Sequence, residues 1–160
     1  VLASGWQELH AGAYPVTNAQ PVFQPEDFEH HADDSLWYST PEIKSELADG
    51  FIILVDARTS ERFEGESEPI DPVAGHVPGA VNFPYQKNLD DDGCFLPADT
   101  LRKLYTDFLG GIDYRHVVHM CGSGVTACHN LLAMEHAGLS GSRLYPGSWS
   151  EWIRTEKPAG

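Results

Sequence analysis

The sequence predicts an α/β domain with a central parallel sheet and helices on both of its faces. Apolar runs that suit strands alternate along the chain with segments of helical period, a pattern typical of parallel sheets. The run 51–55 is apolar without alternation, as expected of a strand that is buried on both faces. In sheets of this kind the working site lies at the carboxyl ends of the strands.

Local signals predict each element in turn. A helix should have Thr40 as its cap and Pro41 at its first position, and Gly50 should end it. Apolar residues recur at helical spacing from Leu101 to Leu109, and two glycines follow that helix. The other expected elements are strands at 36–38, 51–55, 80–83, 117–120 and 143–145, and helices at 60–63, 125–137 and 149–153.

Composition restricts the class of protein. A chain of 160 residues with 41% apolar residues can bury one sizeable core. A formal net charge of −14 argues against nucleic acid or an anionic membrane surface as a partner, and no apolar run has the length of a membrane span. The three cysteines show no disulfide spacing, which favours a reducing compartment and hence a cytoplasmic location.

The two ends of the chain resemble each other. Residues 4–9 (SGWQEL) align with residues 147–152 (GSWSEW) at a constant offset, which also places Pro15 on Pro158. This indicates the closing helix of one repeated domain type at each end. We therefore expect residues 1–13 to be the tail of a preceding domain, 14–34 to be a Pro-containing linker, and 35–160 to be a catalytic domain.

The segment around Cys121 carries the strongest chemical signal. Cys121 follows the apolar run 117–120 and precedes a helical segment, so it should lie at the end of a strand. Gly122 and Gly124 can adopt positive φ, which would let backbone N–H groups converge on the sulfur. These N–H groups and the helix N-terminus favour a thiolate, the reactive form of cysteine. The alternative is a small apolar residue at a strand end.

Four ordered motifs together resemble the rhodanese superfamily, in its 3-mercaptopyruvate sulfurtransferase branch. The loop at 121–127 (CGSGVTA) is similar to the active-site loop of that branch. The other motifs are VDAR at 55–58 with ERF at 61–63, GHVPGA at 75–80 with Asn82 and Pro84, and GSWSEW at 147–152. The resemblance covers about residues 36–153 and implies a rhodanese-like three-layer domain.

The resemblance implies a sulfur relay. Cys121 would be the catalytic nucleophile that takes sulfur from 3-mercaptopyruvate as a persulfide and passes it to a thiol or to cyanide. Arg62 would bind the carboxylate of the donor, while Asp56 and Arg58 would hold the neighbouring loop in shape. The remaining substrate-binding residues that the resemblance implies are Gly122, Ser123, Gly124, Val125 and Thr126. It also implies a preceding rhodanese domain of the same chain at the site, and no cofactor or metal.

Other functions are weighed against this one. In many mercaptopyruvate enzymes a second Arg follows a Glu-Pro pair, but Glu68-Pro69 is followed here by Ile70 and Asp71. A thiosulfate:cyanide sulfurtransferase is therefore the first alternative, although such relatives typically carry basic residues after the cysteine. A non-catalytic rhodanese-like binding module is the second alternative, although such modules usually lack the cysteine. Phosphatase activity is disfavoured, because a phosphatase with this type of loop needs an Arg at the position of Ala127.

The remaining candidate residues favour structural roles. We expect His76 to bond to backbone within its Pro/Gly turn and His119 to be a buried imidazole whose nitrogens have partners. Cys128 should be a core residue on the helix, and Cys94 should lie in an exposed loop. The other histidines do not form zinc-ligand spacing with Cys128.

Overall fold

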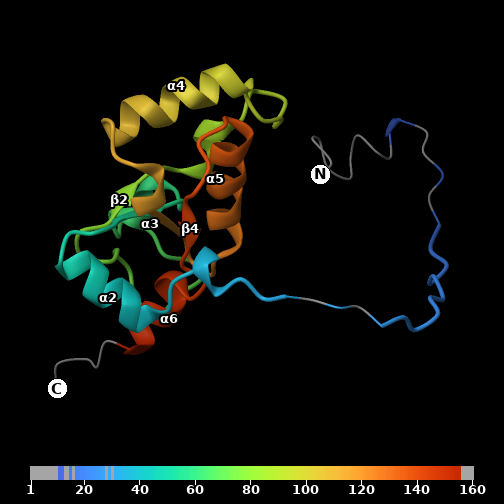
Figure 1. Cartoon of the computed structure of the whole chain (residues 1–160), viewed down its shortest axis with the longest axis horizontal. Helices are drawn as coiled ribbons and strands as arrows, with labels where there is room; N and C mark the ends of the chain where they lie inside the picture. Colours follow the sequence, from blue (N-terminus) through green and yellow to red (C-terminus); the bar gives the residue numbers. More distant parts are fainter. Residues whose placement is uncertain (1–10, 13–14, 16, 28, 30, 156–160) are drawn as a thin grey trace.

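The structure is a computed structural model that describes residues 11, 12, 15, 17–27, 29 and 31–155. Most of the predicted tail at 1–13 lies outside the described residues. Along the predicted linker, residues 17–27 are exposed and form no helix or strand, and Figure 1 shows them as a trace that runs away from the domain. The division into tail, linker and domain stays a prediction.

Four parallel strands form the sheet, in the order β2-β1-β3-β4. The strands are β1 (Ile53–Asp56), β2 (Val81–Asn82), β3 (Val117–Met120) and β4 (Arg143–Leu144). In the central pair, Asp56 of β1 stands beside Met120 of β3, so the two carboxyl ends lie next to each other. The sheet therefore places the segments after β1 and β3 at one edge.

Helices cover both faces of this sheet (Figure 1), which confirms the predicted α/β fold with its three layers. Residues of α4 and α5 pack on one face, and residues of α2 and α6 pack on the other. The helices are α2 (Thr40–Ala48), α3 (Ser60–Phe63), α4 (Ala98–Leu109), α5 (Val125–His136) and α6 (Ser148–Thr155). Short 3₁₀ turns are η1 (Asp34–Leu36), η2 (Tyr85–Asn88) and η3 (Tyr114–His116).

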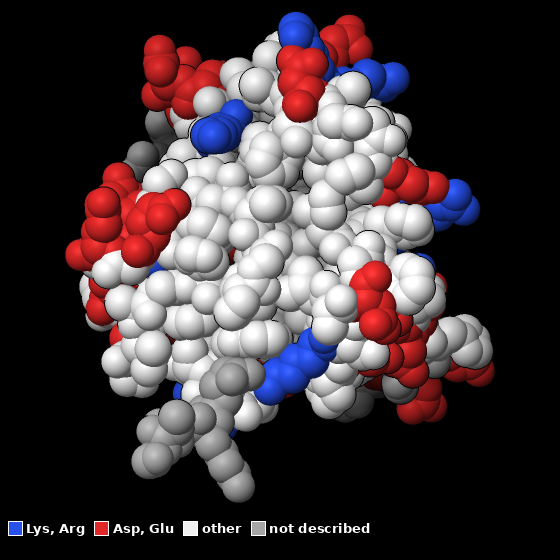
Figure 2. Space-filling model, turned by 90° about the vertical axis from the view of Figure 1, so that its left-hand side faces the viewer, with Lys and Arg blue, Asp and Glu red and all other residues white. Residues whose placement is uncertain are grey.

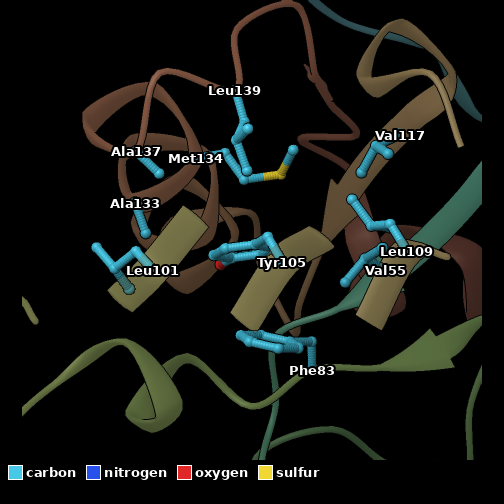
Figure 3. Packing of buried hydrophobic residues seen from close by; sticks show 10 residues of the cluster. All are labelled: Val55, Phe83, Leu101, Tyr105, Leu109, Val117, Ala133, Met134, Ala137 and Leu139. Atoms are coloured by element: carbon cyan, nitrogen blue, oxygen red, sulfur yellow. The ribbon is translucent and has the colours of Figure 1, made fainter. Parts of the chain in front are cut away.

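Strand alternation divides the core into two clusters. Val55 and Val117 point to the face of α4 and α5, where Tyr105 and Met134 pack beside them (Figure 3). Their neighbours on β1 and β3 point to the opposite cluster, which contains Trp149 of α6. A run without polar alternation is what a strand between two apolar layers requires, as the sequence predicted for β1.

Two local expectations were wrong. The segment 36–38 is no strand, because Leu36 closes η1 and Trp37 makes only a single bridge to Leu144. The side chain of Asp33 accepts a hydrogen bond from the backbone N–H of Ser35 and so stabilises the turn. The cap of α2 is Ser39 instead of Thr40, since the Ser39 backbone N–H donates to the Glu42 carboxylate at 2.7 Å in a capping box.

The acidic composition is visible on the surface. The chain has 24 Asp and Glu against 10 Lys and Arg, and on the face in Figure 2 acidic side chains gather at several places. Among the described residues, no helix is long and apolar enough to cross a membrane.

His119 is buried in the α4 and α5 side of the sheet with only one of its nitrogens near a partner. Its Nε2 lies 3.2 Å from Met134 Sδ, whereas Nδ1 has no hydrogen-bond partner. The prediction of a buried imidazole was confirmed. The prediction that both ring nitrogens have partners holds only for Nε2. Burial without a charged partner lowers the pKa of His119 to about 3.

This histidine should make stability depend on pH in mildly acidic solution. The unfolded chain binds a proton at His119 below its ordinary pKa of 6.5, and the folded chain does so only near 3, so unfolding is favoured as pH falls between the two values. One such proton corresponds to about 1.4 kcal/mol per pH unit. His119→Leu should therefore lose less unfolding free energy between pH 6.5 and pH 5 in urea titrations. Equal losses in both proteins would contradict this.

Candidate active site

Cys121 follows directly on β3 and is buried at the edge where the strands end. Its side chain packs with Ala57, which follows β1, and with Ala127 of α5, and the residue is 2% exposed. The Ala57 N–H donates to the carbonyl oxygen of Met120 at 2.8 Å, which joins the two strand ends. The backbone of Cys121 is fixed by α6, because the Trp149 N–H donates to the Cys121 carbonyl at 3.0 Å.

Ser148 also holds the backbone of Cys121, and it was not identified from the sequence. The Cys121 N–H donates to Ser148 Oγ at 3.1 Å, and this hydroxyl donates to the Tyr145 carbonyl at 2.9 Å. Ser148 has φ +53°, and no other described residue besides glycine has a positive φ. Backbone strain at a buried position indicates that the surrounding contacts determine this geometry. The GSWSEW motif contained Ser148, but no sequence signal indicated its bond to Cys121.

The loop after Cys121 uses its two glycines differently. Gly124 has φ +81°, and a Cβ there would lie 2.7 Å from the Pro146 carbonyl oxygen, so only glycine fits. Gly122 does not have positive φ, contrary to expectation. Its missing side chain instead leaves room for a guanidinium, since a Cβ there would lie 3.3 Å from Arg62 Nη2. Gly124 is therefore needed for its backbone conformation, and Gly122 is needed because a side chain there would crowd Arg62.

The start of α5 remains available to an anion. Its N-cap is Gly124, so no side chain caps the helix, and the N–H groups of the first turn have no partner within the helix. Ser123 and Val125 are exposed and Thr126 is partly buried, so the loop lies at the surface. Together with the helix dipole, such N–H groups favour a negative charge.

Arg62, on the short helix α3, reaches this loop from the strand-end segment of β1. Its guanidinium binds Glu68 through Nη2 at 2.6 Å and through Nε at 3.2 Å, and its side chain is 18% exposed. It also borders Gly122, the residue after Cys121. The fold thus brings together the predicted donor-binding arginine and the predicted nucleophile loop.

Asp56 and Arg58 form a buried ion pair at the end of β1. Arg58 Nη2 donates to Asp56 Oδ2 at 2.7 Å and to the carbonyl oxygen of Gly75 at 2.8 Å, and Nη1 donates to Glu68 at 3.1 Å. The Arg58 guanidinium also lies over the ring of Trp149, 5.2 Å from its centroid. These contacts agree with a positioning role for both residues.

Glu68 accepts hydrogen bonds from both arginines. No role for Glu68 itself was predicted from the sequence. Burial alone would raise the pKa of its carboxyl, but hydrogen bonds from Arg62 and from the N–H groups of Asp71 and Ile70 outweigh this and lower the pKa. The carboxylate therefore stays ionised at neutral pH. We use the name ion-pair chain for the linked residues Asp56, Arg58, Glu68, Arg62 and Asp71.

Helix α6 holds the segment that carries Asp71 against the site. Ser150 Oγ donates to Asp71 Oδ1 at 2.7 Å, and Trp149 Nε1 donates to the Val73 carbonyl at 2.8 Å. The other carboxylate oxygen, Asp71 Oδ2, lies 3.8 Å from Arg62 Nη2 and is buried without a hydrogen-bond partner. An acidic residue thus stands in the candidate site, directly after Ile70, where the resemblance to mercaptopyruvate enzymes predicts a second arginine.

The other sequence candidates lie outside this arrangement. His76 bonds to the Phe63 carbonyl at 2.7 Å and stacks on the Phe63 ring, as expected. Cys128 is exposed, which corrects the prediction of a core residue. The buried face of α5 carries Ala127, Asn130, Ala133 and Met134, and the helical spacing turns Cys128 away from it. Cys94 is partly buried instead of exposed, so this prediction was also wrong. Within the described ranges, no three His, Cys, Asp or Glu residues are grouped to hold a metal.

A parallel sheet with a cysteine at the end of a central strand, in a glycine loop that opens a helix, defines a class of domain. The chain belongs to the rhodanese-like domain family, whose model matches residues 39–155. The motifs at 55–63, 75–84, 121–127 and 147–152 all fall within this match. The resemblance to the superfamily is thereby confirmed.

Particular relatives share more than the fold. A probable 3-mercaptopyruvate sulfurtransferase of Pseudomonas aeruginosa is 44% identical over 153 residues, which are 96% of this chain and 54% of that protein. The thiosulfate sulfurtransferase of rat is 31% identical over 99% of this chain and 54% of its own length. The solved structure of 3-mercaptopyruvate sulfurtransferase from Leishmania major has a TM-score of 0.75 at 30% identity, over 95% of this chain and 42% of that one. The chain spans about half the length of the curated relatives it matches.

The Ser148 contact can be tested through stability. Ser148→Ala removes the hydroxyl that accepts the Cys121 N–H and keeps the strained φ, so we expect a loss of about 1–3 kcal/mol in unfolding free energy. Ser148→Gly removes the same hydroxyl but relieves the strain, so its loss should be smaller by about 1 kcal/mol. Urea denaturation of the three proteins measures both values. A Gly variant less stable than the Ala variant would contradict this role for the backbone.

Proposed function

We propose that this chain contains the catalytic domain of a sulfurtransferase that moves sulfur from 3-mercaptopyruvate to a thiophilic acceptor through a persulfide on Cys121. The observation that carries the proposal is the position of Arg62, whose guanidinium borders Gly122, directly after Cys121. A group that binds a carboxylate thus stands beside a nucleophile in a loop that leads into a helix without a side-chain cap. The names of the Pseudomonas and Leishmania relatives support the same activity.

In the first half-reaction the thiolate of Cys121 attacks the sulfur of 3-mercaptopyruvate. A new S–S bond forms, and the C–S bond of the donor breaks. The electron pair of that bond passes to carbon, which is stabilised as the enolate of pyruvate. The proton of the donor thiol passes to the enolate carbon to give pyruvate, and the enzyme keeps the sulfur as a Cys121 persulfide anion. Ser123, exposed next to Gly122, would assist this proton transfer.

The persulfide anion needs a site that stabilises negative charge without water. The backbone N–H groups from Gly122 to Thr126 and the N-terminus of α5 would supply it. Arg62 would bind the donor carboxylate with the guanidinium N–H groups that do not bind Glu68. Asp56 and Arg58 would act by holding Arg62 and its segment in place, through Glu68.

Thiosulfate is the competing donor, because a thiosulfate sulfurtransferase is among the relatives. The ion-pair chain contains two arginines and three carboxylates, so it has one formal negative charge in excess. Negative charge disfavours a dianion more than a monoanion. The loop residues Gly122 and Ser123 add no positive charge. These features support 3-mercaptopyruvate over thiosulfate.

We also propose that a preceding rhodanese domain borders the site in the intact protein and that the protein works in the cytoplasm. Relatives of about twice the length support the first proposal. The second rests on the cysteines, which are all free thiols in the described part of the chain.

Treatment with 3-mercaptopyruvate should add one sulfur atom to the peptide that contains Cys121. Cys121→Ser should abolish this gain, since a hydroxyl does not form the persulfide, and the exposed Cys128→Ser should retain it as the matched control. Mass spectrometry of the digested protein measures both. Sulfur that stays on Cys121→Ser protein would place the nucleophile elsewhere.

The steady-state kcat/KM should be higher with 3-mercaptopyruvate than with thiosulfate. We expect kcat/KM for 3-mercaptopyruvate to exceed that for thiosulfate by about tenfold or more, a difference of about 1.4 kcal/mol. The physical reason is the excess negative charge beside the loop. Assays with the same acceptor, cyanide, measure both values on one protein preparation. A higher kcat/KM with thiosulfate would assign the chain to the other branch.

A further inference from the structure

We propose that Asp71 makes the site selective for sulfur acceptors that carry an ammonium group beside the thiol, the chemistry of an α-amino-acid thiol. The inference rests on the proposed function and concerns its second half-reaction, the transfer of sulfur from the Cys121 persulfide to the acceptor.

The first observation is a buried carboxylate with one unused oxygen. The Asp71 side chain is 7% exposed, and its Oδ1 accepts a hydrogen bond from Ser150 at 2.7 Å. Among the described residues, Oδ2 has no hydrogen-bond partner, and its nearest cation, Arg62 Nη2, is 3.8 Å away. A buried carboxylate oxygen without a donor is unfavourable, so this atom should take an N–H donor when a ligand brings one.

The second observation is where this oxygen lies. A Cβ built on Gly122 would be 3.8 Å from Asp71 Oδ2 and 3.7 Å from Arg62 Nη1. Both groups therefore lie beside Gly122, the residue that follows Cys121. An acceptor that approaches the persulfide sulfur would place its neighbouring substituents near both of them.

The two groups are complementary to a zwitterion. Arg62 uses Nε and Nη2 for Glu68, while its Nη1 has no hydrogen bond to a described residue and can take a carboxylate. Asp71 Oδ2 can take an ammonium. An α-amino-acid thiol carries both charges on one carbon, whereas the α-keto acid donor carries only the carboxylate. The donor would use Arg62 alone, and the acceptor would use both residues.

This arrangement is rigid enough to select between ligands. Two residues of α6 hold the segment that contains Asp71. Ser150 donates to the Asp71 carboxylate, and Trp149 donates to the Val73 carbonyl. A fixed carboxylate discriminates between ligands, because an acceptor without the ammonium leaves Asp71 Oδ2 buried without a hydrogen-bond donor.

The transfer step is a simple exchange between sulfur atoms. The acceptor thiolate attacks the outer sulfur of the Cys121 persulfide and forms a new S–S bond. The bond between the two sulfurs of the enzyme breaks, and Cys121 leaves as a thiolate. The acceptor becomes a persulfide, its thiol proton goes to solvent, and no external oxidant or reductant is needed.

The test separates the two half-reactions. The protein is loaded with 3-mercaptopyruvate, freed of donor and mixed with L-cysteine, cysteamine or 3-mercaptopropionate, and persulfide loss is followed in a single turnover. Cysteamine has the ammonium without the carboxylate, and 3-mercaptopropionate has the carboxylate without the ammonium. Wild type is compared with Asp71→Asn, which can keep the Ser150 bond, and with Asp91→Asn, an exposed carboxylate as the matched control.

We expect Asp71→Asn to form the persulfide and to lower the rates with cysteine and cysteamine by about tenfold relative to 3-mercaptopropionate. Asp91→Asn should leave all three rates unchanged. The comparison of ratios between proteins removes differences in intrinsic thiol reactivity. An equal change with all three acceptors, or none, would overturn the role of Asp71. Failure of the wild type to form any persulfide would instead overturn the proposed function.

A measurement on the wild type alone covers the case in which Asp71→Asn does not fold. L-Serine and 3-hydroxypropionate have the shapes of two of these acceptors but no thiol, and both should compete with the acceptor. Serine should inhibit about tenfold more strongly, because its ammonium pairs with Asp71. Equal inhibition, or stronger inhibition by 3-hydroxypropionate, would contradict the proposal.

Discussion

The arrangement of the site depends on the buried contacts of Arg58. Its guanidinium binds the carboxylates of Asp56 and Glu68 and the Gly75 carbonyl, and it lies over the ring of Trp149. These four partners come from β1, from two parts of the segment after α3, and from α6. Removing one member of such a buried pair typically costs about 3–5 kcal/mol, because the other charge is left without a partner. The geometry around Cys121 is therefore coupled to one side chain that never faces the solvent.

Glu68 connects Arg58 to Arg62, the partly exposed residue that we propose binds the donor. It accepts hydrogen bonds from both Arg58 and Arg62, so the buried arginine fixes the direction of the partly exposed one. The same contacts reduce the net positive charge that Arg62 presents. The loop glycines complete the arrangement, since Gly124 lets the backbone turn beside Pro146 and Gly122 leaves space for the guanidinium. The contacts of Glu68 thus determine both the position of the Arg62 guanidinium and the net charge beside the loop.

Much of the fold was predictable because apolar patterning and breaker residues act locally. The uninterrupted apolar run of β1 and the glycines after α4 indicated a strand buried on both faces and a helix end. The expected strand at 36–38 was wrong, since an Asp33 side-chain contact stabilises a turn that propensity does not reveal. The expected burial of Cys128 was wrong because it depended on which face of α5 meets the sheet.

The sequence alone determined the fold class, the place of Cys121 at a strand end, and Arg62 as a candidate, because these depend on period and on motifs that are contiguous in the chain. Only the tertiary structure decided what surrounds them. The bonds of Ser148 to Cys121 and of Ser150 to Asp71 join α6 to segments that lie far from it in sequence. Burial beside α6 also leaves one oxygen of Asp71 without a hydrogen-bond partner. Such contacts are set by strand order and helix packing, which no local pattern encodes.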